Sequence, residues 1–399
     1  MKLKQQPEDF QVTELSEVVP GDTGDYALFR LDKTGWTTPD ALQVVRTRWQ
    51  LDGRRISFGG LKDRHAVTAQ YFTIFRGPKR NLTHESVTVT YLGQRPEPFT
   101  AAEIRGNRFA ITIRSLSTEH IQAAEEALGQ VDRVGLPNYF DDQRFGSVGD
   151  GKEFIAREMV FGRFERALWL ALAAPYEFDR ADARREKQLL RDRWGDWARL
   201  KTAIPKGHAR ILVEYLASHP TDFKGAVARL RPDLQGLYLA AYQSALWNRM
   251  LALWLYRTMG AGQLAMVDLK LGRVPVPVSV PPAKQAEWAG LSLPLPSARL
   301  KSDPAAWWGG VLDDILREEG LTLPQLKIKG LQRPFFSKGD RPGSVRPTGL
   351  TFTAAADDRH PGCQKMLLKF DLSRGSYATI LVKRIMAASA QLGDAPTRD

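Results

Sequence analysis

The stretch FGGLKDRHAVTAQYF, residues 58–72, carries the strongest indication of fold and chemistry in this chain. Two glycines are followed by the polar tetrad KDRH at residues 62–65, which predicts a tight turn leading into a strand that begins near Thr68. Glycine lets the backbone approach a ligand closely, and a carboxylate placed among cations stays ionised at neutral pH. Asp63 is therefore a candidate nucleophile, although turns rich in Asp, Lys and Arg are also common for solubility alone.

Short β-rich runs lie on both sides of this turn. They are FQVTEL (10–15), YALFRL (26–31), YFTIFR (71–76), SVTVTYL (86–92) and FAITIR (109–114). Between them TPDALQVVRTRW (38–49) has a helical pattern, with Thr38 as the expected N-cap and Pro39 at the first helical position. The first third of the chain is therefore expected to form a sheet with flanking helices.

The middle of the chain, from about residue 155 to 345, is rich in helical patterns and contains proline clusters such as VPVPVSVPP (274–282). The arginine-rich stretch 180–201 suits a solvated helix face at least as well as an RNA-contacting one. Apolar residues at helical spacing predict a buried stripe: Leu239, Tyr242, Leu246, Met250 and Leu253. Two β-rich runs, MLLKFDL (366–372) and YATILVKR (377–384), then return, so the two ends of the chain are expected to share one sheet.

Composition narrows the class of partner. The chain has 399 residues, of which 43% are hydrophobic and 26% charged, as in a globular protein. Its 57 basic and 45 acidic residues give a net charge of +12, which attracts polyanions such as nucleic acids, although a merely basic protein has the same balance. The apolar stretches 167–176 and 250–256 are too short to span a bilayer, and MKLKQQPEDF has no apolar signal core. A cytoplasmic protein without a membrane partner is expected.

Cys363 is the only cysteine, which excludes an intrachain disulfide and suits a reducing compartment. His360 precedes it by three residues, but a structural zinc site needs four ligands and no second Cys or His pair is available. Cys363 is therefore interpreted as inert, and no metal is expected.

Five ordered segments resemble the TruD family of pseudouridine synthases. The run G-x-K-D-R-H-A-V-T-x-Q resembles the family signature, in which the aspartate after the lysine is catalytic. The other segments are PEDFQVTEL (7–15), PNYFDDQRFG (137–146), LAAYQSALWNRML (239–251) and SRGSYATILVKRI (373–385), the last being similar to a C-terminal strand of the family. No such motif is found between about residues 255 and 345.

The resemblance implies an α+β fold with a mixed, mainly antiparallel sheet. The catalytic domain would be discontinuous, over residues 1–155 and 346–399, and a helix-rich TRUD domain would be inserted at residues 156–345. The implied activity is isomerisation of uridine to pseudouridine in tRNA, at uridine 13 as in bacterial members. The implied partner is tRNA, without metal or organic cofactor, and a monomer is expected.

For the site, the resemblance implies Asp63 as the catalytic carboxylate. It also implies that four residues line the uridine pocket: Phe10, Asn138, Phe140 and Tyr377. An asparagine side chain can donate to and accept from the uracil edge, whereas the three aromatic residues, judged by type alone, would more often belong to a core.

Cations around Asp63 are also considered. Lys62 and Arg64 are its neighbours, so on a strand their side chains would point away from that of Asp63. Lys4, just before the PEDF segment, is then the candidate partner of the carboxylate. Arg144 of the QRFG segment is expected to contact RNA backbone or to support its loop.

Two other functions are considered. An RNA-binding protein of the same fold with little catalytic activity is one, which the intact Asp63 and Asn138 disfavour. A nucleotide triphosphatase is the other, because GSVGDGKE (146–153) matches the first seven positions of a phosphate-binding loop. Glu153 stands where that loop needs a hydroxyl for magnesium, and the preceding PNYFDDQR is too polar and aromatic for a buried strand.

Overall fold

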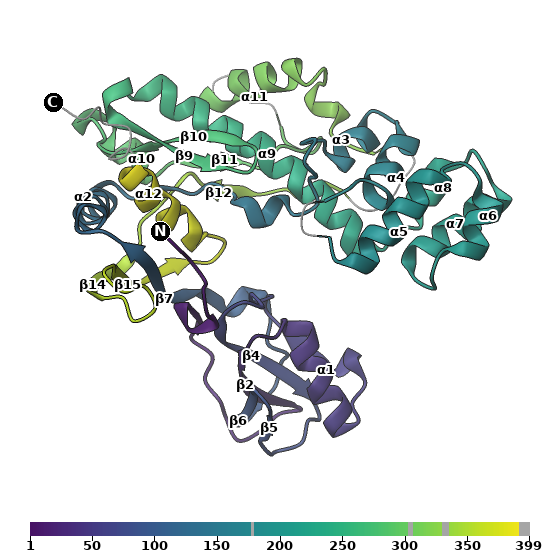
Figure 1. Cartoon of the computed structure of the whole chain (residues 1–399), viewed down its shortest axis with the longest axis horizontal. Coiled ribbons are helices and arrows are strands. Elements are labelled where there is room, and N and C mark those ends of the chain that lie inside the picture. The colour runs from purple at the N-terminus through teal and green to yellow at the C-terminus, as the bar shows by residue number, and fades with distance from the viewer. Residues whose placement is uncertain (177–178, 302–305, 329–334, 391–399) are drawn as a thin grey trace. The chain divides into compact units, whose positions relative to one another are not determined.

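The computed structural model describes residues 1–176, 179–301, 306–328 and 335–390. The chain divides into two compact units, the first comprising residues 1–136 and 345–399 and the second residues 137–344 (Figure 1). The connections between them run through β8 (Leu136–Pro137) and β13 (Ser344–Val345). The expected boundary at 155/156 differs from this division, because residues 137–155 belong to the second unit. The assignment of catalytic and TRUD domains to these parts stays a prediction.

The first unit is built on a nine-stranded sheet in the order β14-β15-β7-β1-β4-β2-β6-β5, with β3 paired to β4. Its strands are β1 (Phe10–Ser16), β2 (Tyr26–Thr34), β3 (Ile56–Phe58), β4 (Val67–Phe75), β5 (Leu82–His84), β6 (Val87–Arg95), β7 (Ile104–Leu116), β14 (Thr348–Ala356) and β15 (Gln364–Ser373). Among the described strands of this sheet, only β1 and β4 pair in parallel. The expected mixed, mainly antiparallel sheet is therefore confirmed.

Strands from both ends of the sequence complete this sheet. In the register of β15 and β7, Phe370 lies opposite Phe109, and their rings stack with centroids 5.4 Å apart. On the other side of β7, Phe109 lies opposite Val12 of β1. The sheet of the first unit is thus discontinuous in sequence, as expected.

The parallel pairing of β1 with β4 determines which segments meet. Gln11 lies opposite Val67, and the register continues to Thr13 and Ala69. Because parallel strands begin at the same edge of a sheet, the segment before β1 and the turn before β4 lie side by side. The first contains Lys4 and the second contains Asp63.

The described part of the first unit contains three α-helices: α1 (Thr38–Trp49), α2 (Thr118–Val134) and α12 (Ala378–Ala390). The apolar face of α1 packs on β2 and β4, where the rings of Phe29 and Phe72 stack 5.2 Å apart. Helices α2 and α12 lie side by side (Figure 1).

The described part of the first unit also contains three 3-10 turns: η1 (Pro7–Asp9), η2 (Gly53–Arg55) and η3 (Ala101–Glu103). Each leads directly into a strand: η1 into β1, η2 into β3 and η3 into β7. The turn η1 matters for the site, because it contains the buried Asp9 and follows the segment that carries Lys4.

Two local expectations are wrong. The N-cap of α1 is Thr37, whose hydroxyl accepts from the Asp40 N–H at 3.2 Å, and Thr38 is instead the first residue of the helix. YATILVKR is also not a strand, because residues 378–390 form α12. Its β-branched residues favour a strand, but its apolar side chains recur at helical spacing and are buried, so tertiary packing overrides the local preference.

The second unit is mainly helical. Its α-helices are α3 (Ile155–Val160), α4 (Phe164–Leu172), α5 (Ala181–Asp192), α6 (Trp197–Ala203), α7 (His208–Ser218), α8 (Phe223–Ala228), α9 (Pro232–Thr258), α10 (Gln285–Ala289) and α11 (Trp307–Glu318). Its short strands form two antiparallel pairs, β9 (Leu264–Leu269) with β10 (Gly272–Pro277) and β11 (Ser292–Pro294) with β12 (Asp340–Pro342). Its 3-10 turns are η4 (Asp142–Phe145), η5 (Ala261–Gln263), η6 (Pro282–Lys284) and η7 (Leu323–Gln325).

Helix α9 is the central element of the second unit. Leu239, Tyr242, Leu246 and Met250 are buried along it, which confirms most of the expected stripe, while Leu253 is partly exposed. Among the described residues, no helix combines the length and the apolar character needed to cross a bilayer.

Candidate active site

The Asp63 carboxylate lies in the turn that precedes β4, at the end of the first unit's sheet where β1 and β4 begin. Its side chain is 37% exposed, and Oδ2 lies 2.5 Å from Nζ of Lys4. The same ammonium lies 4.1 Å from the centroid of the Phe10 ring. The partner expected for Asp63 is therefore in place, in an ion pair that solvent can reach.

The turn is held from behind by a buried lysine. Lys33 is 1% exposed, and its ammonium donates to the carbonyl oxygens of Asp63 at 2.9 Å and of Trp36 at 2.7 Å. The pKa of Lys33 is lowered to about 8, mainly by burial; the charge of Asp63 opposes this shift, and the charge of Lys62 makes a smaller contribution in the same direction as burial. A cation thus lies on each side of Asp63, Lys4 at the carboxylate and Lys33 at the backbone.

A second set of hydrogen bonds fixes the glycine side of the turn. The hydroxyl of Thr38 accepts from the Lys62 N–H at 2.9 Å and donates to Oε1 of Gln70 at 2.8 Å. The Gln70 side chain in turn donates to the carbonyl of Gly60 at 3.0 Å. Because Thr38 and Gln70 are buried, these bonds are shielded from water and restrict the turn.

Lys62 and Arg64 bind elsewhere than Asp63, as their positions in the sequence suggested. Nζ of Lys62 lies 3.0 Å from Oε2 of the fully buried Glu14 carboxylate and donates to Asn107 at 2.6 Å. Arg64 is exposed, and its Nε donates to the carbonyl of Gly35 at 3.3 Å. Lys62 therefore anchors the turn to the sheet, whereas Arg64 binds the backbone of the loop that precedes α1.

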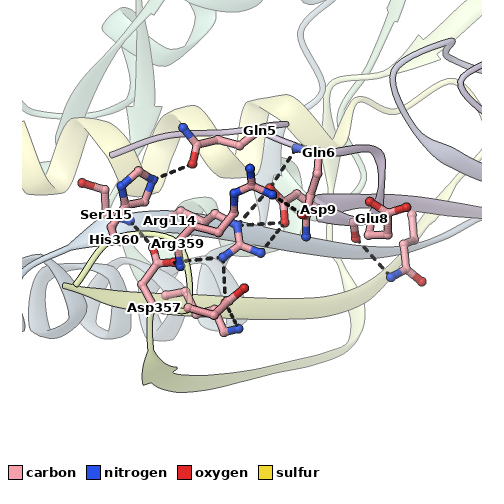
Figure 2. Close-up of polar contacts among 12 residues, drawn as sticks. Gln5, Gln6, Glu8, Asp9, Arg114, Ser115, Asp357, Arg359 and His360 are labelled. Atoms are coloured by element: carbon pink, nitrogen blue, oxygen red, sulfur yellow. Dashed lines mark hydrogen bonds and ion pairs between the residues drawn. The ribbon is translucent and has the colours of Figure 1, made fainter. Parts of the chain in front are cut away.

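The segment that carries Lys4 is tied down by a buried ion network around Arg114 (Figure 2). Nε of Arg114 donates to both carboxylate oxygens of Asp9, at 2.9 and 3.0 Å. Its Nη1 donates to Asp357 and Asp358, each at 2.9 Å. Three carboxylates around one guanidinium keep its pKa above the ordinary value, with Asp9 contributing most. The network joins residues that are far apart in the sequence.

Asp357 is the second centre of this network. Its carboxylate accepts from the N–H groups of Ser115 at 2.8 Å and of Arg359 at 2.9 Å. Burial alone would raise the pKa of Asp357, but the hydrogen bonds from Arg359, Ser115 and Arg114 outweigh burial and hold it below its usual range. The carboxylate is therefore ionised at neutral pH and completes the charge balance around Arg114.

Phe10 and Tyr377, the other expected site residues of the first unit, differ in exposure. Phe10 is 6% exposed, and its ring meets that of Phe109 edge to face with centroids 6.3 Å apart. Tyr377 is partly exposed in the turn before α12, where its carbonyl accepts from the Ile380 N–H at 3.2 Å. Phe10 is therefore a core aromatic residue with Lys4 at its face, and Tyr377 is accessible in part.

Asn138 and Phe140 lie in the second unit, on the segment that follows β8. Asn138 is 5% exposed, and its amide donates to the carbonyl of Pro342 at 3.1 Å while Oδ1 accepts from Arg341 at 2.9 Å. Phe140 is 6% exposed, and its backbone exchanges two hydrogen bonds with the Asn248 side chain, at 2.9 and 2.8 Å. The segment is thus fixed from both sides.

Arginines flank Phe140. The guanidinium of Arg341 lies 4.0 Å from its ring centroid and that of Arg144 lies 5.2 Å from it. Arg144 therefore contacts its own loop in this structure, and a contact with RNA stays a prediction. Arg341 was missed by sequence reasoning, because it lies in the stretch where no motif was found.

Lys33 and Glu14 were also missed, although the sequence carries a signal for both. Ala27, Phe29 and Leu31 alternate along β2 on its buried face, and Lys33 continues that alternation. Glu14 continues the buried alternation of β1 in the same way. A charged residue at an inward position of a strand needs a partner, which marks it as a structural or functional anchor.

The segments considered for other chemistry do not form such sites in the described part of the chain. GSVGDGKE follows the 3-10 turn η4 rather than a strand, which does not match a phosphate-binding loop. Among the described residues no group of three or more His, Cys, Asp and Glu side chains is arranged to hold a metal ion. Cys363 is partly exposed with Sγ 3.9 Å from the Ser115 hydroxyl, and His360 bonds to Gln5.

Comparisons with known proteins agree over nearly the whole chain. The sequence model of the family "tRNA pseudouridine synthase D (TruD)" matches residues 1–271 and 279–385. The "Probable tRNA pseudouridine synthase D 1" of Methanococcus maripaludis is 29% identical over 96% of this chain and 99% of its own length. The "tRNA pseudouridine synthase D" of Aquifex aeolicus is 28% identical over 98% of this chain and 99% of its own length.

A solved structure gives the same result for the fold. The crystal structure of the putative tRNA pseudouridine synthase D of Methanosarcina mazei superposes with a TM-score of 0.69 at 25% identity, covering 96% of this chain and 93% of that chain. A match of this extent, in sequence and in fold, shows that the chain belongs to the TruD family of tRNA pseudouridine synthases.

Proposed function

We propose that this chain isomerises uridine to pseudouridine in tRNA, with the Asp63 carboxylate as its catalytic group. The observation that carries the proposal is the setting of Asp63: an accessible carboxylate in a turn fixed by buried polar groups, paired with Lys4. The family match adds the class of reaction and the class of substrate. Rigid support of an exposed charged group is typical of a catalytic position.

The reaction needs a carboxylate near the sugar and the base. The bond between the ribose anomeric carbon and N1 breaks, the uracil turns, and a bond from the anomeric carbon to C5 forms. C5 loses its proton and N1 gains one, so that the product is an isomer of the substrate. Positive charge develops at the anomeric carbon, as it does in glycoside hydrolysis, and an anionic oxygen stabilises or attacks it. Asp63 is the proposed carboxylate, and three routes are open to it: attack on the sugar, addition to the uracil ring, or assistance to a glycal route.

Lys4 has a defined part in this proposal. Its ammonium, 2.5 Å from Oδ2, leaves the second carboxylate oxygen of Asp63 without that contact. One oxygen is thereby oriented by the cation, and the other is directed to the substrate. An ion pair at a partly exposed position orients a carboxylate without burying it.

Binding of the uridine needs an extruded base, because a stacked base is out of reach of a carboxylate on a protein surface. Phe10 and Tyr377 of the first unit and Asn138 and Phe140 of the second are proposed as uridine-binding residues. Asn138 already makes one bond through its amide nitrogen and one through its oxygen, which leaves one N–H and one lone pair for a uracil edge. Tyr377 is the most accessible of the three aromatic residues, and stacking is its proposed role.

The substrate details are proposals on the same basis. The net charge of +12 supports a polyanionic partner, and the family name of the relatives specifies tRNA. Uridine 13 is the proposed position, the cytoplasm the proposed location, and a monomer the proposed state. Neither a metal nor an organic cofactor is needed for the chemistry described.

The test replaces Asp63 by Asn in the full chain, which keeps the shape of the side chain and removes its charge. Release of tritium from a tRNA transcript labelled at uracil C5 measures the reaction, because C5 loses its hydrogen when the new bond forms. We expect a loss of at least about 1,000-fold in rate. Asp22→Asn, in an exposed loop of the same unit, is the matched control and keeps the parental rate.

Two results would contradict the proposal. A parental rate for Asp63→Asn would show that the Asp63 carboxylate is not the catalytic group. Absence of tritium release from every uridine of the transcript by the parental chain, combined with tight tRNA binding, favours the RNA-binding protein without catalytic activity.

A further inference from the structure

The segment Lys2–Asp9, named here the N-terminal strap, is fastened at both ends by one residue. At its start, the backbone N–H of Lys2 donates to the Arg114 carbonyl and the Arg114 N–H donates to the Lys2 carbonyl, both at 2.9 Å. At its end, the Asp9 carboxylate accepts from the Arg114 guanidinium at 2.9 Å. Lys4 lies between these two attachments.

The centre of the strap is fastened by the loop that contains Arg359 and His360 (Figure 2). Nη1 of Arg359 donates to Oε1 of Gln6 at 2.6 Å, and Nε2 of His360 lies 2.5 Å from Oε1 of Gln5. This loop is held in turn by Asp357, which binds Arg114 and the backbone of Arg359. Gln5 and Gln6, the two residues that follow Lys4, are thus both bound by the loop that Asp357 holds.

The backbone of Lys4 is in a conformation that needs support. Its φ of 49° lies in the left-handed region, which is unfavourable for a side chain of this type. A free segment would relax from this conformation, and the ammonium would then leave Asp63. An ion pair between partly exposed groups is weak by itself because it must order two long side chains, so prior fixation of the backbone is what makes the contact persistent.

We propose that Arg114, Asp357, Arg359 and His360 are positioning residues, which hold the N-terminal strap so that the Lys4 ammonium stays on the Asp63 carboxylate. This inference rests on the proposed function, since it assigns the network a part in the same site. Their side-chain hydrogen bonds run to the strap, to one another, and to Ser115 and Asp358. They act through the backbone of Lys4.

The test removes the exposed hydrogen bonds to the strap and leaves the buried ion pairs around Arg114 intact. Arg359→Ala with His360→Ala removes the bonds to Gln6 and Gln5 and keeps the Arg114–Asp9 pair. We expect the single-turnover rate to fall roughly tenfold, because a displaced catalytic contact costs one to two orders of magnitude. The KM for tRNA is expected to change by less than twofold, and the thermal midpoint to stay within the error of the measurement.

A double-mutant cycle with Lys4→Met identifies the route of the effect. If the network acts through Lys4, the loss caused by Arg359→Ala with His360→Ala shrinks to less than twofold in the Lys4→Met chain. An equal loss in both chains overturns the proposal, as does a parental rate for Lys4→Met. Arg105→Ala is the control, because it cuts an exposed ion pair with Glu17 in the same unit without touching the strap.

Labelling of lysine amines supplies a readout that needs no activity. Acetic anhydride modifies the free amine, and peptide mass spectrometry compares Lys4 with the exposed Lys79 in the same sample. Cutting the fastenings is expected to raise the labelling rate of Lys4 at least threefold relative to Lys79, and an unchanged ratio overturns the proposal. If Lys4→Met has no measurable rate, the labelling ratio alone tests the positioning role.

Failure of the proposed function and failure of the positioning role give different results. Asp63→Asn at a parental rate removes the catalytic site and the inference with it. Loss of activity in Asp63→Asn, with parental rate and parental Lys4 labelling after the fastenings are cut, contradicts only the positioning role.

Discussion

Replacement of Lys33 by Met tests the claim that the turn of Asp63 is supported by a buried charge. Methionine fills a similar volume without the ammonium. Lys33 is 1% exposed, and burial lowers its pKa from the ordinary 10.5 to about 8. A depression of that size corresponds to roughly 3 kcal/mol that the folded state loses by holding the cation, since each pKa unit is worth about 1.4 kcal/mol.

The sign of the pH dependence follows from which state binds the proton. Below pH 8 both states carry the charge, so the penalty is fully present. Between pH 8 and 10.5 the unfolded chain remains protonated while the folded chain releases its proton, so stability rises with pH. The free energy of unfolding of the parent, relative to Lys33→Met, is therefore expected to increase by about 2 to 3 kcal/mol from pH 7 to pH 10.

The assay must report on the first unit. Trp36 and Trp49 are its two tryptophans, and 5-fluorotryptophan places a fluorine reporter at each. Urea titrations followed by fluorine NMR at pH 7, 8, 9 and 10 then give the two stabilities, and the difference cancels other titrating groups. At pH 7 the difference is expected to be small, because the variant also leaves the carbonyls of Asp63 and Trp36 without a donor. A difference that stays constant within 0.5 kcal/mol, about a third of a pKa unit's worth, would refute the burial argument.

Three further outcomes are expected. Arg114→Met leaves buried carboxylates without their cation and should lower the free energy of unfolding of the first unit by about 3 to 5 kcal/mol, whereas Arg105→Ala should cost less than about 1 kcal/mol, both measured by urea denaturation. Asn248→Ala removes both side-chain bonds to the Phe140 backbone and should lower the stability of the second unit by about 2 kcal/mol or more in calorimetry, and a change under 0.5 kcal/mol would contradict that role. Raising the salt concentration from 50 to 200 mM should weaken tRNA binding by about 10-fold or more in filter binding, because Lys and Arg contacts release counterions, and a salt-independent affinity would exclude a phosphate-dominated interface.

Much of the first unit follows from local pattern. The alternation of apolar and polar residues in FQVTEL, YALFRL and FAITIR predicts strands, and β1, β2 and β7 contain them. The helix over residues 38–49 is also as expected, although Thr37 rather than Thr38 caps it. The N-cap is set by the φ and ψ of one residue. The sequence alone does not show which of two adjacent threonines adopts that conformation.

The C-terminal run YATILVKR shows where local pattern is insufficient. Its Thr, Ile and Val residues favour a strand, yet the segment forms α12 against α2. The deciding energy is the burial of Ile380, Leu381 and Ile385 on one helical face, which depends on a surface that another part of the chain supplies.

The sequence by itself determined the family resemblance, the candidate carboxylate Asp63 and the exclusion of a disulfide, because these depend on residue identity and order alone. Only the tertiary structure decided that Lys4 lies on Asp63, since that contact requires the parallel register of β1 and β4. It also decided that Lys33 and Arg114 are buried, the first against the backbone of Asp63 and the second against the Asp9 carboxylate. A contact between residues 59 positions apart is a property of strand pairing, and no local pattern contains it.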